Sequence, residues 1–151
     1  MSKFKLPIIF ILAAIVCVGG YVFSKSFFSS EYEENIEKYI KLLKDDPVNC
    51  FYNEQIAANY QALNEFTKAI EHYQVAVKNC PENLISIFDI GICYYVTMEK
   101  QKGLDYMDKA IEKARKANKR DLESMFIKSK AEWLEKWDSI KNLDWNKGRK
   151  T

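Results

Sequence analysis

The sequence predicts an all-α protein built from stacked helical hairpins, and two observations support this. First, one pattern occurs twice at a fixed separation of 34 residues. Second, the chain has only 5 Gly and 3 Pro among 151 residues, few breakers for its length. Such a period is typical of arrays in which each hairpin packs on the next. The matched pairs are Asn49 and Asn83, Ile56 and Ile90, Ala57 and Gly91, Tyr60 and Tyr94, Ala69 and Gly103, Tyr73 and Met107, and Ala76 and Ala110.

Composition fits one small domain, with 48% hydrophobic and 29% charged residues. Lys3 and Lys5 account for the formal net charge of +2, so the remainder of the chain is neutral. A neutral domain lacks the basic surface that nucleic acid requires, and we expect no nucleic-acid partner. The short basic tail over residues 146–151 is interpreted as a frayed, solvated end.

The N-terminal stretch over residues 6–23 contains no charged residue. Its 18 residues would form a helix of about 27 Å, close to the thickness of a bilayer core. Two lysines precede it and an acidic run follows, so the positive-inside rule leaves residues 1–5 in the cytoplasm. We expect an uncleaved signal anchor with a linker over residues 24–30. Two alternatives remain, a cleaved secretory signal and a lipoprotein signal ending at Cys17. All three place the domain outside the cytoplasm, in the periplasm or the extracellular space.

The segment 31–48 reads as one amphipathic helix. Ile36, Tyr39, Ile40 and Leu43 recur at three- and four-residue spacing, and the residue before Pro47 ends the helix. Its register matches the second helix of the repeat. We therefore interpret it as a half-repeat whose first helix is missing.

Segments 49–82 and 83–118 carry the two full copies of the pattern. Ile56-Ala57-x-x-Tyr60, followed by Ala69-x-x-x-Tyr73, Ala76 and Pro81, resembles the tetratricopeptide repeat (TPR). The second copy departs from the family by lacking the closing proline. The resemblance implies an α-solenoid in which small residues mark the helix crossings and large ones fill the gaps between hairpins. We expect Asn49 and Asn83 to be N-caps and Asn64 to adopt a left-handed turn.

The last predicted helix, over residues 119–145, would cap the array. Its apolar face comprises Leu122, Phe126, Trp133, Trp137 and Ile140. We expect the two tryptophans to pack on the preceding repeat, with a partner contact as the alternative.

Four cysteines are present, and two of them suggest a pairing. Cys50 starts the first helix of a hairpin and Cys80 ends the second, so antiparallel packing would bring them together. We predict a Cys50–Cys80 disulfide, which would suit an oxidising compartment. Its test is a Cα separation below about 7 Å. Cys93 is expected to be a buried free thiol and Cys17 to be apolar filler.

Nothing in the sequence suggests catalysis. His72 is the only histidine and is expected to be exposed; no spacing fits a metal or a phosphate-binding loop. We expect no cofactor, no metal and no small-molecule substrate.

In TPR proteins the first helix of each hairpin lines a partner-binding groove, which the resemblance places on seven residues here. The second copy is apolar there, so two interpretations remain: an open groove for a helix or extended segment, or coverage by the C-terminal helix. Lys, Asn and Arg, which relatives use to hold a carboxylate, are absent. The groove candidates are Phe51, Glu54, Ala58, Ile85, Phe88, Ile92 and Tyr95.

These observations predict a non-enzymatic, membrane-anchored protein-binding adaptor that assists assembly of an envelope complex. The alternatives are a secreted form after signal cleavage, a receptor facing the cytosol, and a thiol–disulfide redox protein using Cys50 and Cys80. The lack of a Cys-x-x-Cys pair disfavours the redox protein.

Overall fold

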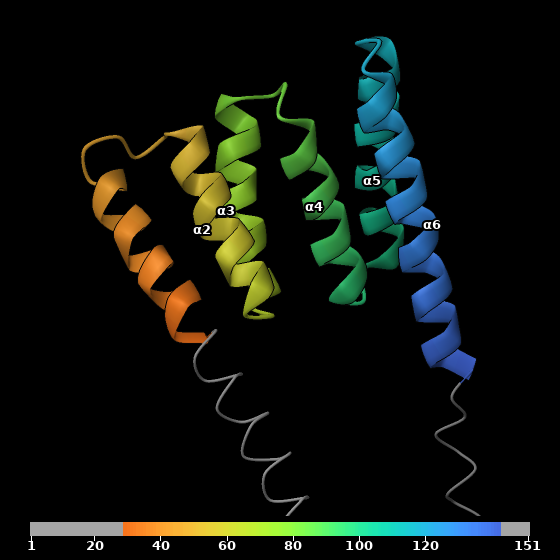
Figure 1. Ribbon diagram of the computed structural model, residues 1–151, viewed down its shortest axis with the longest axis horizontal. Coiled ribbons are helices and arrows are strands. Elements are labelled where there is room, and N and C mark those ends of the chain that lie inside the picture. The colour runs from red at the N-terminus through yellow and green to blue at the C-terminus, as the bar shows by residue number, and fades with distance from the viewer. Residues whose placement is uncertain (1–28, 143–151) are drawn as a thin grey trace, which may run out of the picture.

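A computed structural model describes the backbone of residues 29–142 and the side chains of residues 29–136. Its helices form a single row of antiparallel pairs (Figure 1). The row begins with a helix over residues 29–43, called the N-terminal helix below. Then follow α2 (Cys50–Ala62), α3 (Phe66–Asn79), α4 (Leu84–Val96), α5 (Lys100–Lys116) and α6 (Arg120–Asn142). The predicted all-α, TPR-like arrangement is therefore observed, with α2–α3 as the first hairpin and α4–α5 as the second.

The ends of the helices follow the repeat. The side-chain oxygen of Asn49 accepts a hydrogen bond from the Tyr52 N–H at 3.0 Å, and Asn83 accepts one from the Ser86 N–H at 3.1 Å. Both predicted N-caps are thus confirmed.

The turns between paired helices also repeat. Asn64 has the predicted left-handed conformation, with φ of 62°, and Met98 occupies the equivalent position with φ of 71°. In both turns the following glutamate N–H bonds back to the tyrosine carbonyl of the last helical turn, Glu65 to Tyr60 at 2.8 Å and Glu99 to Tyr94 at 3.0 Å. This closure is the Schellman pattern, which satisfies carbonyls left free at a helix end.

Small residues mark the crossing points of both hairpins, as predicted. Ala57 and Ala69 are fully buried where α2 crosses α3. At the crossing of α4 and α5, a Cβ added to Gly91 would lie 2.7 Å from the Gly103 carbonyl oxygen. A Cβ added to Gly103 would lie 2.6 Å from the Gly91 carbonyl oxygen. The second hairpin therefore crosses at a distance that only glycine permits.

Two clusters of buried side chains hold the row together. One joins the first hairpin to α4 and includes Ile70, Tyr73 and Ile90. The other lies among α4, α5 and α6, with Phe126 from α6 at 1% exposure and Trp133 partly buried against it. Trp133 thus packs on the preceding repeat, as expected; the side chains of Trp137 and Ile140 lie outside those described.

The N-terminal helix joins α2 through aromatic rings. Tyr39 lies 6.0 Å from both Phe51 and Tyr52, measured between ring centroids. At the positions equivalent to Ala69 and Ala76, this helix carries Asn35 and Leu42. It therefore lacks the small residues with which the complete hairpins make their close crossings.

The predictions for residues 1–28 and 143–151 fall outside the described residues. These include the signal anchor over residues 6–23, Cys17 and the basic tail. Within the described part of the chain, none of the helices combines the length and the apolar character that crossing a bilayer needs.

Candidate protein-binding face

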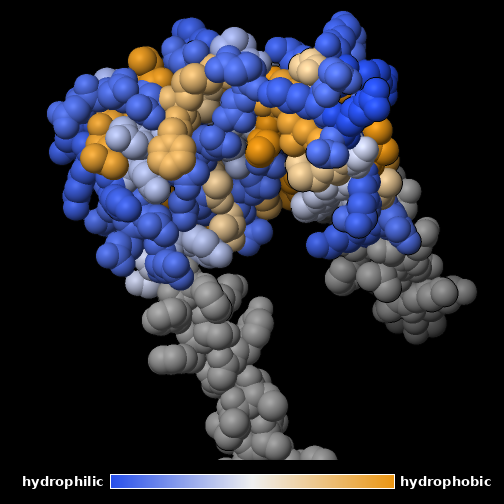
Figure 2. Space-filling model, turned by 45° about the horizontal axis from the view of Figure 1, so that its top comes forward, coloured by the Kyte–Doolittle hydropathy of each residue, from blue (hydrophilic) through white to orange (hydrophobic). Residues whose placement is uncertain are grey.

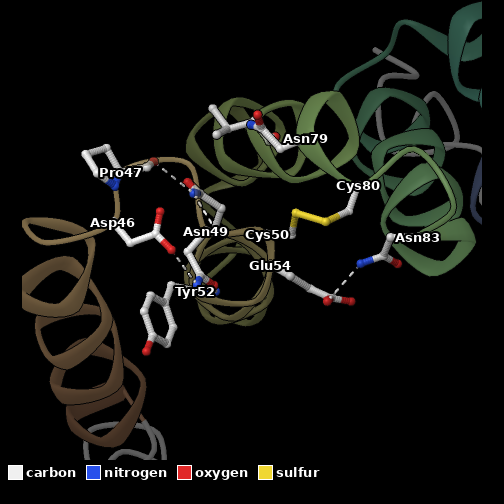
Figure 3. Close-up of a disulfide and its surroundings, with 11 residues drawn as sticks. Asp46, Pro47, Asn49, Cys50, Tyr52, Glu54, Asn79, Cys80 and Asn83 are labelled. Carbon is white, nitrogen blue, oxygen red and sulfur yellow. Dashed lines mark hydrogen bonds between the residues drawn. A yellow bond between two sulfur atoms is a disulfide. The ribbon is translucent and has the colours of Figure 1, made fainter.

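The first hairpin is closed by a disulfide between Cys50, at the start of α2, and Cys80, just after α3 (Figure 3). The two Cα atoms are 6.0 Å apart, which meets the limit of about 7 Å set by disulfide geometry. The bond spans 30 residues of sequence. It fixes the end of the hairpin from which the connection to α4 departs.

The predicted groove residues fall into two groups. Four of them are accessible: Phe51 is 54% exposed, Ile85 is 47% exposed, Ala58 is exposed and Glu54 is partly exposed. Phe51 and Ile85 occupy the same repeat position, 34 residues apart, so α2 and α4 each present one apolar side chain from the second residue of the helix. Such matched exposure is what a surface for an extended or helical segment requires.

The other three candidates do not line an open groove. Phe88, Ile92 and Tyr95 are only 3%, 7% and 5% exposed. The ring of Phe88 stacks on Phe126 of α6, with centroids 4.6 Å apart and planes at 7°. Of the two interpretations left open by the sequence, the structure supports coverage of these residues by the C-terminal helix, α6. The physical reason is that α4 is packed on both sides, by the first hairpin on one and by α5 and α6 on the other.

Two carboxylates lie beside the accessible group. The Asn83 amide donates to Glu54 Oε2 at 2.9 Å, which ties α2 to the residue capping α4 (Figure 3). The hydroxyl of Tyr73 lies 2.9 Å from Gln61 Oε1 and 3.3 Å from Asp89 Oδ2. Helices α2, α3 and α4 therefore meet in one polar network. We call the surface formed by Phe51, Glu54, Ala58, Ile85 and Asp89 the α2–α4 face.

The charge on this face is uncompensated. The pKa of Asp89 is raised to about 6, mainly because the carboxyl group is buried; the hydrogen bond from Tyr73 opposes this rise and the charge of Glu54 adds to it. Ion pairs in the described part of the chain all involve other residues, such as Glu65 with Lys68 and Asp108 with Lys130. Glu54 and Asp89 therefore lie near each other without an ion-pair partner among the described residues, which makes this region electronegative. Burying a carboxylate without such a partner is also costly.

The polar network was only partly visible in the sequence. Asp89 is an acid within an otherwise apolar helix, and that was the available signal. Tyr73 was interpreted as a filler between hairpins; it is buried, but its hydroxyl also serves the network. Glu54 and Asn83 are 29 residues apart, and no local pattern links them.

The expectation of an exposed His72 was wrong. His72 is partly buried, its ring stacks on Tyr60 at 5.8 Å, and Nδ1 lies 3.0 Å from Asn53 Oδ1. The Asn53 amide nitrogen donates to the carbonyls of Asn49 and Pro47, so its oxygen faces the histidine and accepts a hydrogen bond from Nδ1–H. Burial lowers the pKa of His72, which favours the neutral ring. The contact fastens the start of α2 to α3.

The remaining reactive groups offer little chemistry. Cys93 is a buried free thiol, as predicted, and burial raises its pKa to about 12. It is therefore protonated and unreactive near neutral pH. Among the described residues, no group of His, Cys, Asp and Glu side chains is arranged to hold a metal ion.

Hydrophobic residues on the face drawn in Figure 2 form several patches separated by hydrophilic ones rather than one continuous band.

The fold compares with known proteins as follows. No family model matches the chain. The small glutamine-rich tetratricopeptide repeat-containing protein 2 of Saccharomyces cerevisiae is 27% identical over 105 residues, 67% of this chain. The chain spans only 30% of the length of that yeast protein.

Two solved structures share the arrangement of helices. The crystal structure of MamA matches with a TM-score of 0.57 and 24% identity, covering 64% of this chain and 56% of MamA. The TPR2B domain of yeast Sti1, in complex with pHsp70, matches with a TM-score of 0.58 and 18% identity. The match covers 72% of this chain and 90% of that chain. These likenesses establish a TPR-like fold.

Proposed function

We propose that this protein is a non-enzymatic adaptor that binds a protein partner through the α2–α4 face. The observation that carries the proposal is the matched exposure of Phe51 and Ile85, one repeat apart on a TPR-like frame. Apolar side chains presented at a repeat spacing suit a segment that runs along the array. A fold of this kind in complex with pHsp70, as in the Sti1 structure, supports the same use here.

We further propose that the domain works outside the cytoplasm, held by a signal anchor over residues 6–23. The proposed organisation is a half-repeat over residues 31–48, repeats over 49–82 and 83–118, and a capping helix over 119–145. The Cys50–Cys80 disulfide supports this location, because such bonds persist in oxidising compartments and are rare in the cytosol. Assistance in assembling an envelope complex is the role we infer for such an anchored adaptor.

Topology is tested by fusing a reporter to the C-terminus of the full chain. We expect activity from a reporter that works only outside the cytoplasm. The purified chain should have the mass of the full sequence, with its N-terminus uncleaved. A shortened N-terminus would indicate signal cleavage and a secreted form. A signal only from a cytosolic reporter would favour the receptor facing the cytosol and would remove the envelope role.

Partner binding is tested by affinity capture with the full chain in detergent. The variant Phe51→Ser with Ile85→Ser should lose at least about tenfold in captured partner, since each exposed side chain contributes apolar contact area. The matched control is Met125→Ser with Ile127→Ser, which changes two side chains of similar exposure on α6. Equal losses in both double variants would remove the proposed role of the α2–α4 face.

A further inference from the structure

The apolar part of the α2–α4 face is held in place by neighbouring side chains. Phe51 contacts the rings of Tyr39 and Tyr52, each at 6.0 Å between centroids, yet remains 54% exposed. Ile85 stands at the equivalent position of the next hairpin. Tyr39 of the N-terminal helix and Tyr52 of α2 therefore both contact the Phe51 ring. A segment lying across α2 and α4 would find an apolar contact at each repeat.

The polar part of the face indicates what such a segment carries. Glu54 of α2 is bonded to Asn83 at the start of α4, and Asp89 of α4 is linked through the Tyr73 hydroxyl to Gln61 of α2, so both carboxylates lie where α2 and α4 meet. Their hydrogen-bond partners are the neutral side chains of Asn83 and Tyr73. Lys113 of α5 reaches the connection between α3 and α4, but its ammonium group donates to the carbonyl of Pro81 at 3.0 Å. Both carboxyl groups are thus partly buried with only neutral side chains as hydrogen-bond partners, an arrangement that costs stability whenever the groups are charged.

We propose that the α2–α4 face accepts a partner segment in which a lysine or arginine is flanked by apolar residues. The cation lies between the carboxylates of Glu54 and Asp89, and the flanking residues contact Phe51 and Ile85. This deepens the proposed function and rests on it. The same charges disfavour an anionic membrane surface or a nucleic acid, because both would be repelled. An arginine has the better geometry, since its planar donors can serve two carboxylates at once.

The test uses the full chain in detergent, with its disulfide intact, and three labelled synthetic peptides. The peptides share leucines around a central arginine, citrulline or glutamate and have blocked ends. We expect anisotropy titrations to show the arginine peptide binding at least about tenfold more tightly than the citrulline peptide, the size expected for a charge-assisted contact. The glutamate peptide should bind more weakly still. Added salt should reduce the difference in affinity between the arginine and citrulline peptides, because it screens the charges.

Variants separate charge from contact area. Glu54→Gln with Asp89→Asn keeps an acceptor oxygen for Asn83 and for Tyr73, so the fold is retained while the charges are removed. This variant should bind the arginine and citrulline peptides equally. Phe51→Ser with Ile85→Ser should weaken all three peptides together. The control Glu71→Gln removes an exposed acid on α3 and should leave the preference intact.

Several outcomes overturn the inference. They are equal binding of arginine and citrulline peptides by the unchanged chain, no binding above a detergent blank, and equal loss of preference in Glu71→Gln. Saturable self-association without a charge preference would assign the face to a second copy of the chain and also overturn it. If partner capture depends on Phe51 and Ile85 but not on Glu54 and Asp89, the adaptor function is supported and the cation site is wrong. If capture depends on neither pair, the adaptor function and the cation site are both wrong.

Discussion

The two hairpins share one register but are held together by different means. The first closes with a disulfide and crosses through alanines, Ala57 and Ala69. The second has no covalent closure in the described structure; it crosses through Gly91 and Gly103 and is covered by α6. A repeat therefore fixes where helices cross, while the means of stabilising each crossing varies from copy to copy. The hairpin with the covalent closure is also the one that contributes the more polar half of the α2–α4 face.

The largest effect should come from removing the cover of the second hairpin. Phe126→Ala deletes a fully buried ring that stacks on Phe88, and we expect a loss of about 3–5 kcal/mol in the free energy of unfolding. Urea unfolding measures it. Met125→Ala, at an exposed neighbour, is the control and should change little. A loss below about 1 kcal/mol for Phe126→Ala would mean that α6 does not cover this core in solution.

Removing the covalent closure of the first hairpin should cost slightly less. Cys50→Ser with Cys80→Ser releases a constraint on 30 residues of the unfolded chain, worth about 3–4 kcal/mol in the chain-entropy model. Adding reductant to the unchanged protein should lower its free energy of unfolding by a similar amount. Equal free energies of unfolding for the oxidised and reduced protein would contradict the disulfide. A redox enzyme, by contrast, would show a disulfide that mild reductants open readily.

The two crossings require different residues, so opposite substitutions should each destabilise the hairpin in which they are made. Gly103→Ala places a Cβ 2.6 Å from both the Gly91 carbonyl oxygen and the Tyr95 backbone nitrogen, which cannot move aside easily. We expect a loss of about 1–3 kcal/mol even though alanine favours helices. The opposite change in the first hairpin, Ala69→Gly, should cost about 1 kcal/mol through helix propensity, plus the contact it removes. A Gly103→Ala protein as stable as the parent would show that the second crossing is looser than described.

These crossings were predictable from the sequence because they follow from the period alone. The same holds for the N-caps and for the turn at Asn64, since each depends on residues within one or two helical turns. The sequence could not decide whether Phe88, Ile92 and Tyr95 are open to solvent or covered by the C-terminal helix. Their exposure depends on where α6 lies, and no local pattern specifies how a terminal helix docks. The same limit applies to His72, whose partner Asn53 is 19 residues away on another helix.

A smaller effect should depend on pH. The pKa of Asp89 is about 6 in the folded protein against 3.8 for a free side chain, so the folded state binds more protons between these values. Stability should therefore fall as pH rises through this window. Asp89→Asn should be more stable than the parent by about 1–2 kcal/mol at pH 7.5 and should lose that advantage near pH 4. Thermal unfolding at several pH values measures it; a pH-independent difference would contradict the raised pKa.

The smallest effect concerns the turn of the second hairpin. Met98 is 69% exposed and holds a left-handed backbone, which a residue with a Cβ adopts at a cost. Met98→Gly should therefore raise stability by about 0.5–1 kcal/mol. In the first hairpin Asn64, a residue that tolerates this geometry, should gain less from the same change. A destabilised Met98→Gly protein would indicate that the methionine side chain makes a contact that matters.

The two capping asparagines also have a mechanical consequence. Asn49 uses its amide nitrogen within its own turn, donating to Asp46 at 2.9 Å, whereas Asn83 donates to Glu54 of the neighbouring hairpin. The two hairpins are thus joined by a hydrogen bond from a side chain that also caps a helix, while the N-terminal helix contacts α2 through the edge-on and tilted rings of Tyr39, Phe51 and Tyr52. We therefore expect a bending force on the array to change first the angle between the N-terminal helix and α2. The angle between α2 and α4 should change less.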